Sequence, residues 1–219
     1  MIKVHFFDVD YTLLPKSSTF FFLKEARQQN VLSRNDVRRF PLELIRYKLG
    51  LIHYDFIEMA LTKLTGKSLL AMQQVAEECF ERRIKPILFT EGIEKIKHLI
   101  QAGERVVFAT SAFGQQIEPF KRFYGVEEAI TSTLEVDPQT GFLTGRSVGK
   151  PLFGDNKRQK VVEWLQNEGI EPNEASFYTD SYTDLPLLKE IGEQICVNPD
   201  RFLIREAKKN KWEILHWEK

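Results

Sequence analysis

Residues 2–12 read IKVHFFDVDYT, an apolar run that stops abruptly at two carboxylates, Asp8 and Asp10. A short apolar run of this kind predicts a strand that is buried on both faces, as in parallel sheets. In open α/β sheets, ligands bind just beyond the carboxyl ends of such strands. The first dozen residues therefore predict a parallel sheet with chemistry at the end of its first strand.

The segment from residue 15 to about residue 103 shows helical periodicity and no strand signal. Met72, Val75, Ala76, Cys79 and Phe80 have the spacing of one buried helix stripe, which places Cys79 in the core. Because this block follows the first strand, we expect residues 15–88 to be an inserted, lid-like helical domain. Helices are expected at 18–29, 34–50 (bent or split at Pro41), 54–64, 69–84 and 92–102.

From Glu104 onward, apolar strand candidates alternate with helical stretches. Such alternation predicts a doubly wound, mostly parallel α/β sheet with right-handed crossovers. We therefore expect a Rossmann-like catalytic core made of residues 1–14 and 89–219. Its expected strands are 106–109, 129–134, 175–179 and 194–197, its helices are 115–124, 156–167, 185–191 and 201–209, and Gly141, Gly145 and Gly149 indicate a hairpin.

Composition excludes some classes of protein. The 31 Lys and Arg residues balance the 31 Asp and Glu residues, so no overall charge attracts nucleic acid. No run approaches the roughly 20 apolar residues of a membrane span. Cys79 and Cys196 fit neither a disulfide framework nor a metal pair, and free thiols indicate a reducing, cytoplasmic environment. The four histidines, at 5, 53, 98 and 216, lack metal-like spacing.

Polar side chains follow four of the predicted strands or open the next helix. They are Asp8 and Asp10, then Thr110 and Ser111, then Lys157, and finally Asp180 and Asp184. All of them are expected at one edge of the sheet, where clustered carboxylates repel one another and require a cation. Because every ligand is an oxygen, Mg²⁺ is the expected metal.

A metal, a lysine and hydroxyl or amide donors around one point can hold a phosphoryl group. Asp8 is the expected nucleophile, and Asp10, two residues further on, is expected to move protons. Thr110 is expected to donate its hydroxyl, Ser111 its backbone amide and Lys157 its charge. Ser111 remains a rival to Thr110 as side-chain donor, and Lys160 is a rival to Lys157 that the pattern of its helix instead places on an exposed face.

Taken together, these residues closely resemble the haloacid dehalogenase-like superfamily, in its phosphoserine-phosphatase-like branch with a helical cap. The family pattern DxDxT is matched by Asp8, Asp10 and Thr12, and the later positions by Thr110, Lys157, Asp180 and Asp184. The resemblance implies that Mg²⁺ is held by the Asp8 carboxylate, the Asp10 carbonyl and Asp180, with Asp184 in support. It also implies a phosphatase, because dehalogenases and phosphonatases of this superfamily lack the second aspartate.

Two positions depart from the family pattern. Tyr11 stands where many members have a small residue, and Ser17 stands where phosphoserine phosphatases carry a cap glutamate for the substrate ammonium group. The resemblance thus implies a Mg²⁺-dependent phosphomonoesterase for a small phosphorylated metabolite, with no nucleic acid partner. Lys63 lies near the place of a carboxylate-binding arginine in those enzymes, without a role that the sequence assigns.

Other functions share some of these residues. A receiver domain, phosphorylated on aspartate and slow to hydrolyse, also combines carboxylates, Thr or Ser, and Lys around Mg²⁺, but it has no helical insert after the first strand. A phosphate-binding sensor that has lost catalysis is a third possibility, which the intact Asp8 and Asp10 pair disfavours. The run Thr19–Leu23 could line an apolar pocket or touch a lipid, and the basic group at 38, 39, 46 and 48 could steer an anionic substrate; core packing and a solvated helix face are the simpler interpretations.

Overall fold

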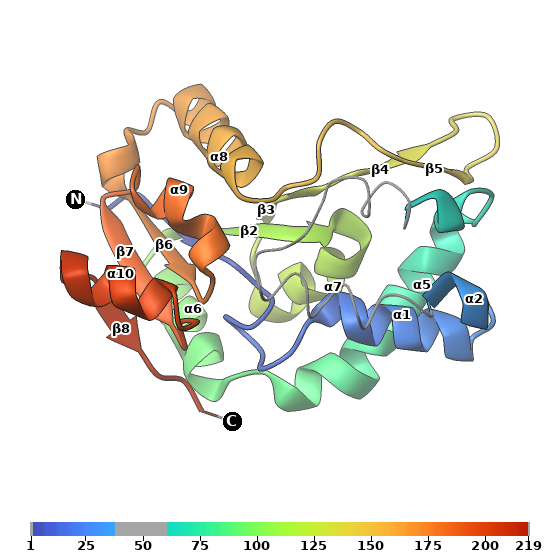
Figure 1. The fold of residues 1–219 in the computed structure, drawn as a ribbon, viewed down its shortest axis with the longest axis horizontal. Coiled ribbons are helices and arrows are strands. Elements are labelled where there is room, and N and C mark those ends of the chain that lie inside the picture. The colour runs from blue at the N-terminus through green and yellow to red at the C-terminus, as the bar shows by residue number, and fades with distance from the viewer. Residues whose placement is uncertain (1, 38–60, 219) are drawn as a thin grey trace.

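In the computed structural model, residues 2–37 and 61–218 are described, and they form a three-layer α/β arrangement with a helical region at one end (Figure 1). The main sheet has six strands in the order β3-β2-β1-β6-β7-β8, and all its pairs are parallel. This confirms the predicted α/β fold. The strands are β1 Val4–Phe7, β2 Arg105–Phe113, β3 Glu128–Ser132, β6 Ala175–Thr179, β7 Glu193–Val197 and β8 Glu213–Leu215.

Two groups of helices cover the two faces of this sheet (Figure 1). Side chains alternate along β1, so Phe6 packs with one group and Phe7 with the other. One face carries α6 Thr90–Gln101 and α7 Gly114–Tyr124, and the other carries α8 Asp155–Glu168, α9 Leu185–Leu188 and α10 Leu203–Asn210. Because β1 is buried on both faces, its whole Val4–Phe7 run is apolar or internally paired.

The helical region follows β1 in the chain. Its described helices are α1 Ser18–Gln28, α2 Arg34–Val37 and α5 Leu69–Cys79, and α5 continues into a π-helical turn over Phe80–Ile84. The chain enters and leaves this region at one place, because the Phe89 N–H donates to the Leu13 carbonyl over 2.9 Å. That contact is what an insertion into the sheet domain requires. The division into a core of 1–14 and 89–219 and a cap of 15–88 stays a prediction.

A two-stranded antiparallel hairpin, β4 Leu134–Val136 and β5 Leu143–Ser147, extends from β3 toward the helical region (Figure 1). The glycine spacing predicted this hairpin. Backbone hydrogen bonds from Gly66 to Leu143 and from Leu143 to Lys67 join it to the segment before α5. The hairpin therefore ties the sheet domain to the helical region at a second place.

Several element boundaries differ from the predicted ones. The strand expected at 129–134 is divided between β3 and β4, and the helix expected at 185–191 ends at Leu188. The expectation that Thr110 and Ser111 follow their strand is wrong, since β2 continues to Phe113. Strand β8 was not predicted, because three residues, none of them buried, give too short a pattern. Most of the helices expected at 34–50 and 54–64, with Pro41, His53 and the basic group at 38, 39, 46 and 48, lie outside the described residues.

Candidate active site

Asp8 is the first residue beyond β1, at the carboxyl edge of the sheet. Phe7 still pairs with Phe108 on one side and Tyr178 on the other, and the Asp8 N–H donates to the Tyr178 carbonyl over 2.9 Å. Its side chain is buried, with the residue 4% exposed. Asp8 is thus fixed by the two neighbouring strands, as the apolar run before it predicted.

Lys157 contacts two of the carboxylates. It lies in the first turn of α8, and its Nζ is 3.4 Å from Asp8 Oδ1 and 2.9 Å from the Asp184 carboxylate. Asp184 also accepts a hydrogen bond of 2.7 Å from the Thr179 hydroxyl at the end of β6. All of these groups are buried, so the ammonium group is held between two carboxylates and away from bulk water.

Thr12 and Asp180 join the two ends of the site. The Asp180 N–H donates to the Thr12 hydroxyl over 3.0 Å, and that hydroxyl donates to Asp180 Oδ1 over 3.3 Å. On the other side, the Asp180 carbonyl accepts from the Asp200 N–H over 2.8 Å. This pairing fixes the loop after β6 relative to the loop after β1, and it gives Thr12, which the sequence identified only as part of a motif, a physical role.

Asp10 is held by the start of α1. Its Oδ2 accepts a hydrogen bond of 2.9 Å from the Ser17 hydroxyl, and its Oδ1 accepts one of 2.8 Å from the Ser18 N–H. Tyr11, between the two motif residues, has a positive φ of 61°, which turns the chain sharply at this point. Ser17 also caps the helix, because its Oγ accepts from the Phe20 N–H over 3.3 Å.

Thr110 and Ser111 occupy β2 beyond the point where its pairing with β1 ends at Phe108. The pairing with β3 is also irregular between Ala109 and Phe113, so both residues lie in a stretch of β2 with interrupted pairing. Thr110 is buried and Ser111 partly exposed, and the Ser111 carbonyl accepts from the Ser132 hydroxyl over 2.9 Å. Among the described residues, neither hydroxyl is hydrogen-bonded to an aspartate of the cluster. Which of the two donates its hydroxyl to a phosphate oxygen therefore stays a prediction.

The electrostatics of the cluster show an excess of negative charge. Burial raises the pKa of Asp8 to about 7, although Lys157 opposes the rise, and Asp184 and Asp10 add to it. The pKa of Asp180 lies well above its usual range for the same reasons, burial first and then the charges of Asp8, Asp184 and Asp200. Four carboxylates thus share one buried ammonium group, which leaves unfavourable repulsion in the cluster.

This donor set fits a hard dication. Asp8 and Asp180 bring carboxylate oxygens, and within the described part of the chain no sulfur or imidazole is part of the cluster. Among residues 2–37 and 61–218, no three His, Cys, Asp or Glu side chains are arranged to hold a metal by themselves. Mg²⁺ binds in proteins through one or two carboxylates, waters and substrate phosphate, and the oxygen donors of Asp8 and Asp180 are of that kind.

The haloacid dehalogenase-like hydrolase family matches residues 5–189, which is most of the chain and includes Asp8, Asp10, Lys157, Asp180 and Asp184. The chain belongs to the haloacid dehalogenase-like hydrolases. A phosphoserine phosphatase of Mycobacterium tuberculosis is 28% identical over 95% of this chain and 69% of its own length. A histidinol-phosphatase of Neisseria meningitidis is 25% identical over 99% of this chain and 100% of its own length.

The fold of this hydrolase agrees with a solved structure as well. A Bordetella pertussis protein of unknown function has a TM-score of 0.85 and 26% identity, covering 98% of this chain and 99% of its own. The family assignment separates this hydrolase from receiver domains. In the part of the chain that is described, no helix combines the length and apolar character that crossing a membrane requires.

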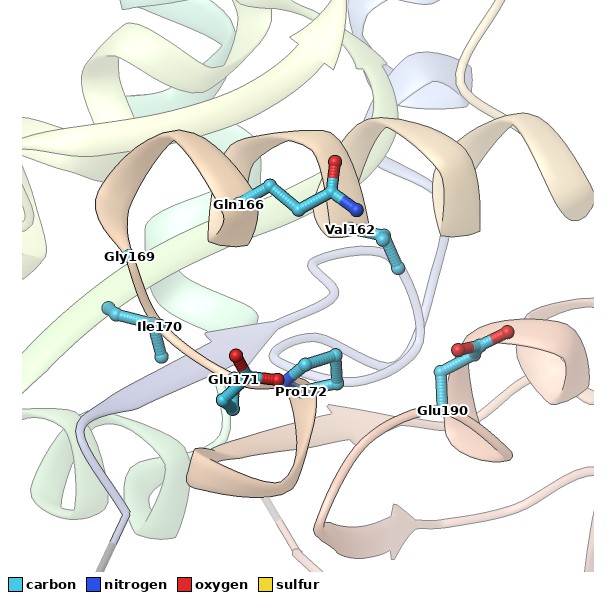
Figure 2. Close-up of a pocket in the computed structure, with 7 residues that line it drawn as sticks. All are labelled: Val162, Gln166, Gly169, Ile170, Glu171, Pro172 and Glu190. Carbon is cyan, nitrogen blue, oxygen red and sulfur yellow. The ribbon is translucent and has the colours of Figure 1, made fainter.

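A cavity of about 460 Å³ lies elsewhere in this hydrolase (Figure 2). It is lined by Val162 and Gln166 of α8, the turn at 169–172, and Glu190 after α9. Lys157 belongs to the first turn of α8, whereas this cavity lies along its second half and the turn that follows. The cavity is therefore separate from the aspartate cluster and contains none of the predicted site residues.

The remaining candidates of the hydrolase fall outside the site. Lys160 is exposed and pairs with Glu163 at 2.7 Å, and Lys63 is exposed. Phe22 packs in the core, which fits the packing interpretation of the run Thr19–Leu23. The sequence missed Thr179 and Ser18 as neighbours of the carboxylates. A polar pair such as Ser17-Ser18 before an apolar run does signal a helix start, but that signal does not identify the acceptor.

Proposed function

We propose that the protein is a Mg²⁺-dependent phosphatase that hydrolyses a small phosphomonoester through an aspartyl-phosphate on Asp8. The observation that carries the proposal is the position of Lys157, whose ammonium group lies between Asp8 and Asp184 at the end of β1. A positive charge beside a buried carboxylate can neutralise a phosphoryl group while that carboxylate attacks it. The names of the two phosphatase relatives support the same reaction class.

In the first step, an oxygen of Asp8 attacks phosphorus, and the bond between phosphorus and the ester oxygen breaks. Asp10 gives its proton to the departing alkoxide. In the second step, Asp10 takes a proton from water as the water oxygen attacks phosphorus, which releases inorganic phosphate and restores Asp8. Burial raises the pKa of the Asp10 carboxyl group, and hydrogen bonds from Ser18 and Ser17 oppose the rise.

The other residues hold the transferring group. Asp8, the Asp10 carbonyl and Asp180 would bind Mg²⁺, which would neutralise phosphate charge. Thr110 would donate its hydroxyl to a phosphate oxygen, Ser111 its backbone N–H, and Lys157 its charge. Asp184, which accepts from Lys157 and Thr179, would keep the ammonium group in place. Thr12 would hold Asp180 through their paired hydrogen bonds.

The substrate is proposed only as a class, a small phosphorylated metabolite. The chain has Ser17 where phosphoserine phosphatases carry a cap glutamate, and Ser17 is occupied by Asp10 and the Phe20 N–H. Phosphoserine itself is therefore not our proposed substrate. Both cysteines are buried free thiols, which fits the proposed cytoplasmic location.

The test is turnover of an aryl phosphate, and of a panel of phosphorylated metabolites, with Mg²⁺ and with EDTA. Asp8→Asn should abolish turnover, and acid-quenched wild-type enzyme should carry phosphate on the peptide that contains Asp8. Asp10→Asn should slow turnover yet still bind vanadate, since it removes proton transfer more than charge recognition.

The matched control is Asp137→Asn, in the hairpin turn, where the new side chain can still accept from the Gln139 and Thr140 N–H groups. It should leave turnover unchanged. Full activity of Asp8→Asn would rule out the nucleophile. A wild-type phosphoprotein that decays over hours would instead indicate a receiver-like module, and binding of phosphate without turnover would indicate a sensor.

A further inference from the structure

The first turn of α1 surrounds the carboxylate of Asp10. Ser17 Oγ donates to one oxygen over 2.9 Å, and the Ser18 N–H donates to the other over 2.8 Å. Both serines are buried, at 4% and 1% exposure. Burial raises the pKa of the Asp10 carboxyl group, and hydrogen bonding from Ser18 and Ser17 opposes that rise.

Two donors on two oxygens restrict rotation of the carboxyl group. The terminal torsion of an aspartate is broad when the group is free, so orientation has to come from partners. Ser17 is itself oriented, because its oxygen accepts from the Phe20 N–H over 3.3 Å and its proton is then directed to Asp10. Two hydrogen bonds, from the Phe20 N–H to Ser17 and from Ser17 to Asp10, therefore make the orientation of the carboxylate depend on the first turn of α1.

We propose that Ser17 is a positioning residue for proton transfer, which fixes Asp10 against the first turn of α1 so that Asp10 faces the departing oxygen. This proposal rests on the proposed phosphatase function and extends it to a residue of the helical region. Ser17 begins α1 and Asp10 follows β1, so this contact joins the helical region to the end of the first strand. Proton delivery then depends on how the helical region sits on the sheet.

The consequence is a dependence on the leaving group. A nitrophenyl phosphate releases a stable phenolate that needs little protonation, whereas an alkyl phosphate releases an alkoxide that needs a proton as it departs. The value of kcat/KM reports the steps up to the departure of the leaving group. A misoriented Asp10 should therefore lower kcat/KM for the alkyl ester far more than for the aryl ester.

The experiment compares kcat/KM for para-nitrophenyl phosphate with that for the alkyl phosphate of the metabolite panel that wild type hydrolyses fastest. Ser17→Ala and Ser17→Gly should lower the alkyl value about tenfold and the aryl value less than about threefold. Ser17→Thr keeps the hydroxyl and should restore most of the alkyl rate. Glycine is included because it caps helices almost as well as serine, so Ser17→Gly separates orientation from folding.

Ser68→Ala is the matched control, since Ser68 caps α5, another helix of 11 residues, by accepting from the Ala71 N–H at 3.4 Å. It should lose similar capping stability and leave the ratio of alkyl to aryl rates unchanged. Equal losses on both esters, or no loss in Ser17→Gly, would overturn the positioning role. Activity that survives in Asp8→Asn would instead defeat the proposed function, so the two failures are distinguishable.

Discussion

Within the described residues, two buried groups of charges are built in opposite ways. At the sheet edge, Asp8, Asp10, Asp180 and Asp184 surround the ammonium group of Lys157, the one buried cation that the described residues bring there. Between α1 and the turn after α5, one carboxylate, Glu25, meets two arginines, Arg82 and Arg83. The first group has too much negative charge, and the second has its buried charge matched.

The pKa values respond accordingly. Burial would raise the pKa of Glu25, but hydrogen bonds from Arg83 and Gln29 and the charges of both arginines outweigh it, so the pKa lies below its usual range. At the sheet edge, burial and like charges act together and raise the pKa of Asp8 and Asp180. A buried carboxylate that is matched by positive charge needs no ligand, whereas a cluster with excess negative charge is stabilised by one. The cluster at the sheet edge therefore marks the candidate site.

The largest expected effect comes from removing Lys157, the cation of the unmatched cluster. Lys157→Met should reduce kcat for an aryl phosphate by roughly 10²–10³, comparable with the loss of one preorganised donor. The same change leaves Asp8 and Asp184 without their shared partner. Steady-state kinetics provide the measurement, and Lys160→Met, on the exposed side of α8, is the control that should keep wild-type kcat. A Lys157→Met enzyme with normal kcat would contradict the assigned role.

Breaking the matched group should affect stability and not chemistry. Glu25→Gln removes the charge that Arg83 contacts at 2.5 Å and leaves that arginine, 20% exposed, without its ion partner. We expect a loss of about 2 kcal/mol in the free energy of unfolding, below the full cost of a broken buried pair because Arg83 reaches solvent. Urea unfolding measures it. A change below about 0.5 kcal/mol would show that the pair is solvent-screened.

In contrast to Glu25→Gln, a substitution that neutralises a carboxylate of the unmatched cluster should increase the free energy of unfolding. Asp180 has a raised carboxyl pKa, and such a group costs stability at every pH above its ordinary value of 3.8. Asp180→Asn removes that cost and can still accept from Thr12, so in EDTA it should stabilise the fold by about 1 kcal/mol. Mg²⁺ should raise the melting temperature of wild type and not of the variant. A less stable variant in EDTA would contradict the excess of charge.

The sequence indicated which strand ends lie together at the sheet edge, and the roles of the residues there stay a prediction. In a parallel sheet the residue after each apolar run reaches the same edge, so Asp8 and Asp180 needed only the pattern to be placed together. Lys157 was separated from Lys160 by periodicity, since the burial of Val161 and Leu165 turns Lys157 inward and Lys160 outward. Strand ends and helix periodicity are local patterns that are visible in a single sequence.

The matched group and the Asp10 contacts were not predictable in this way. Glu25 and Arg83 lie 58 residues apart, and their pairing depends on how α1 packs against α5. Ser17 and Ser18 signal a helix start, yet only the return of the chain over Leu13 and Leu14 brings them to Asp10. The extension of β2 through Ser111 was missed for a similar reason, because a strand end is set by its neighbours and not by its own composition.

The smallest effect is expected in acid. Because the pKa of Glu25 is lowered in the folded protein, its stabilisation is complete above the ordinary value of 4.5 and is lost as the pH falls below it. The free energy of unfolding of wild type should therefore decrease more steeply between pH 5 and pH 3 than that of Glu25→Gln, and the two curves should converge at the acid end. Urea titrations at several pH values measure the slopes. Parallel curves would show that the pKa of Glu25 is the same in the folded and unfolded chain, and the contrast between the two charge groups would then rest on the sheet edge alone.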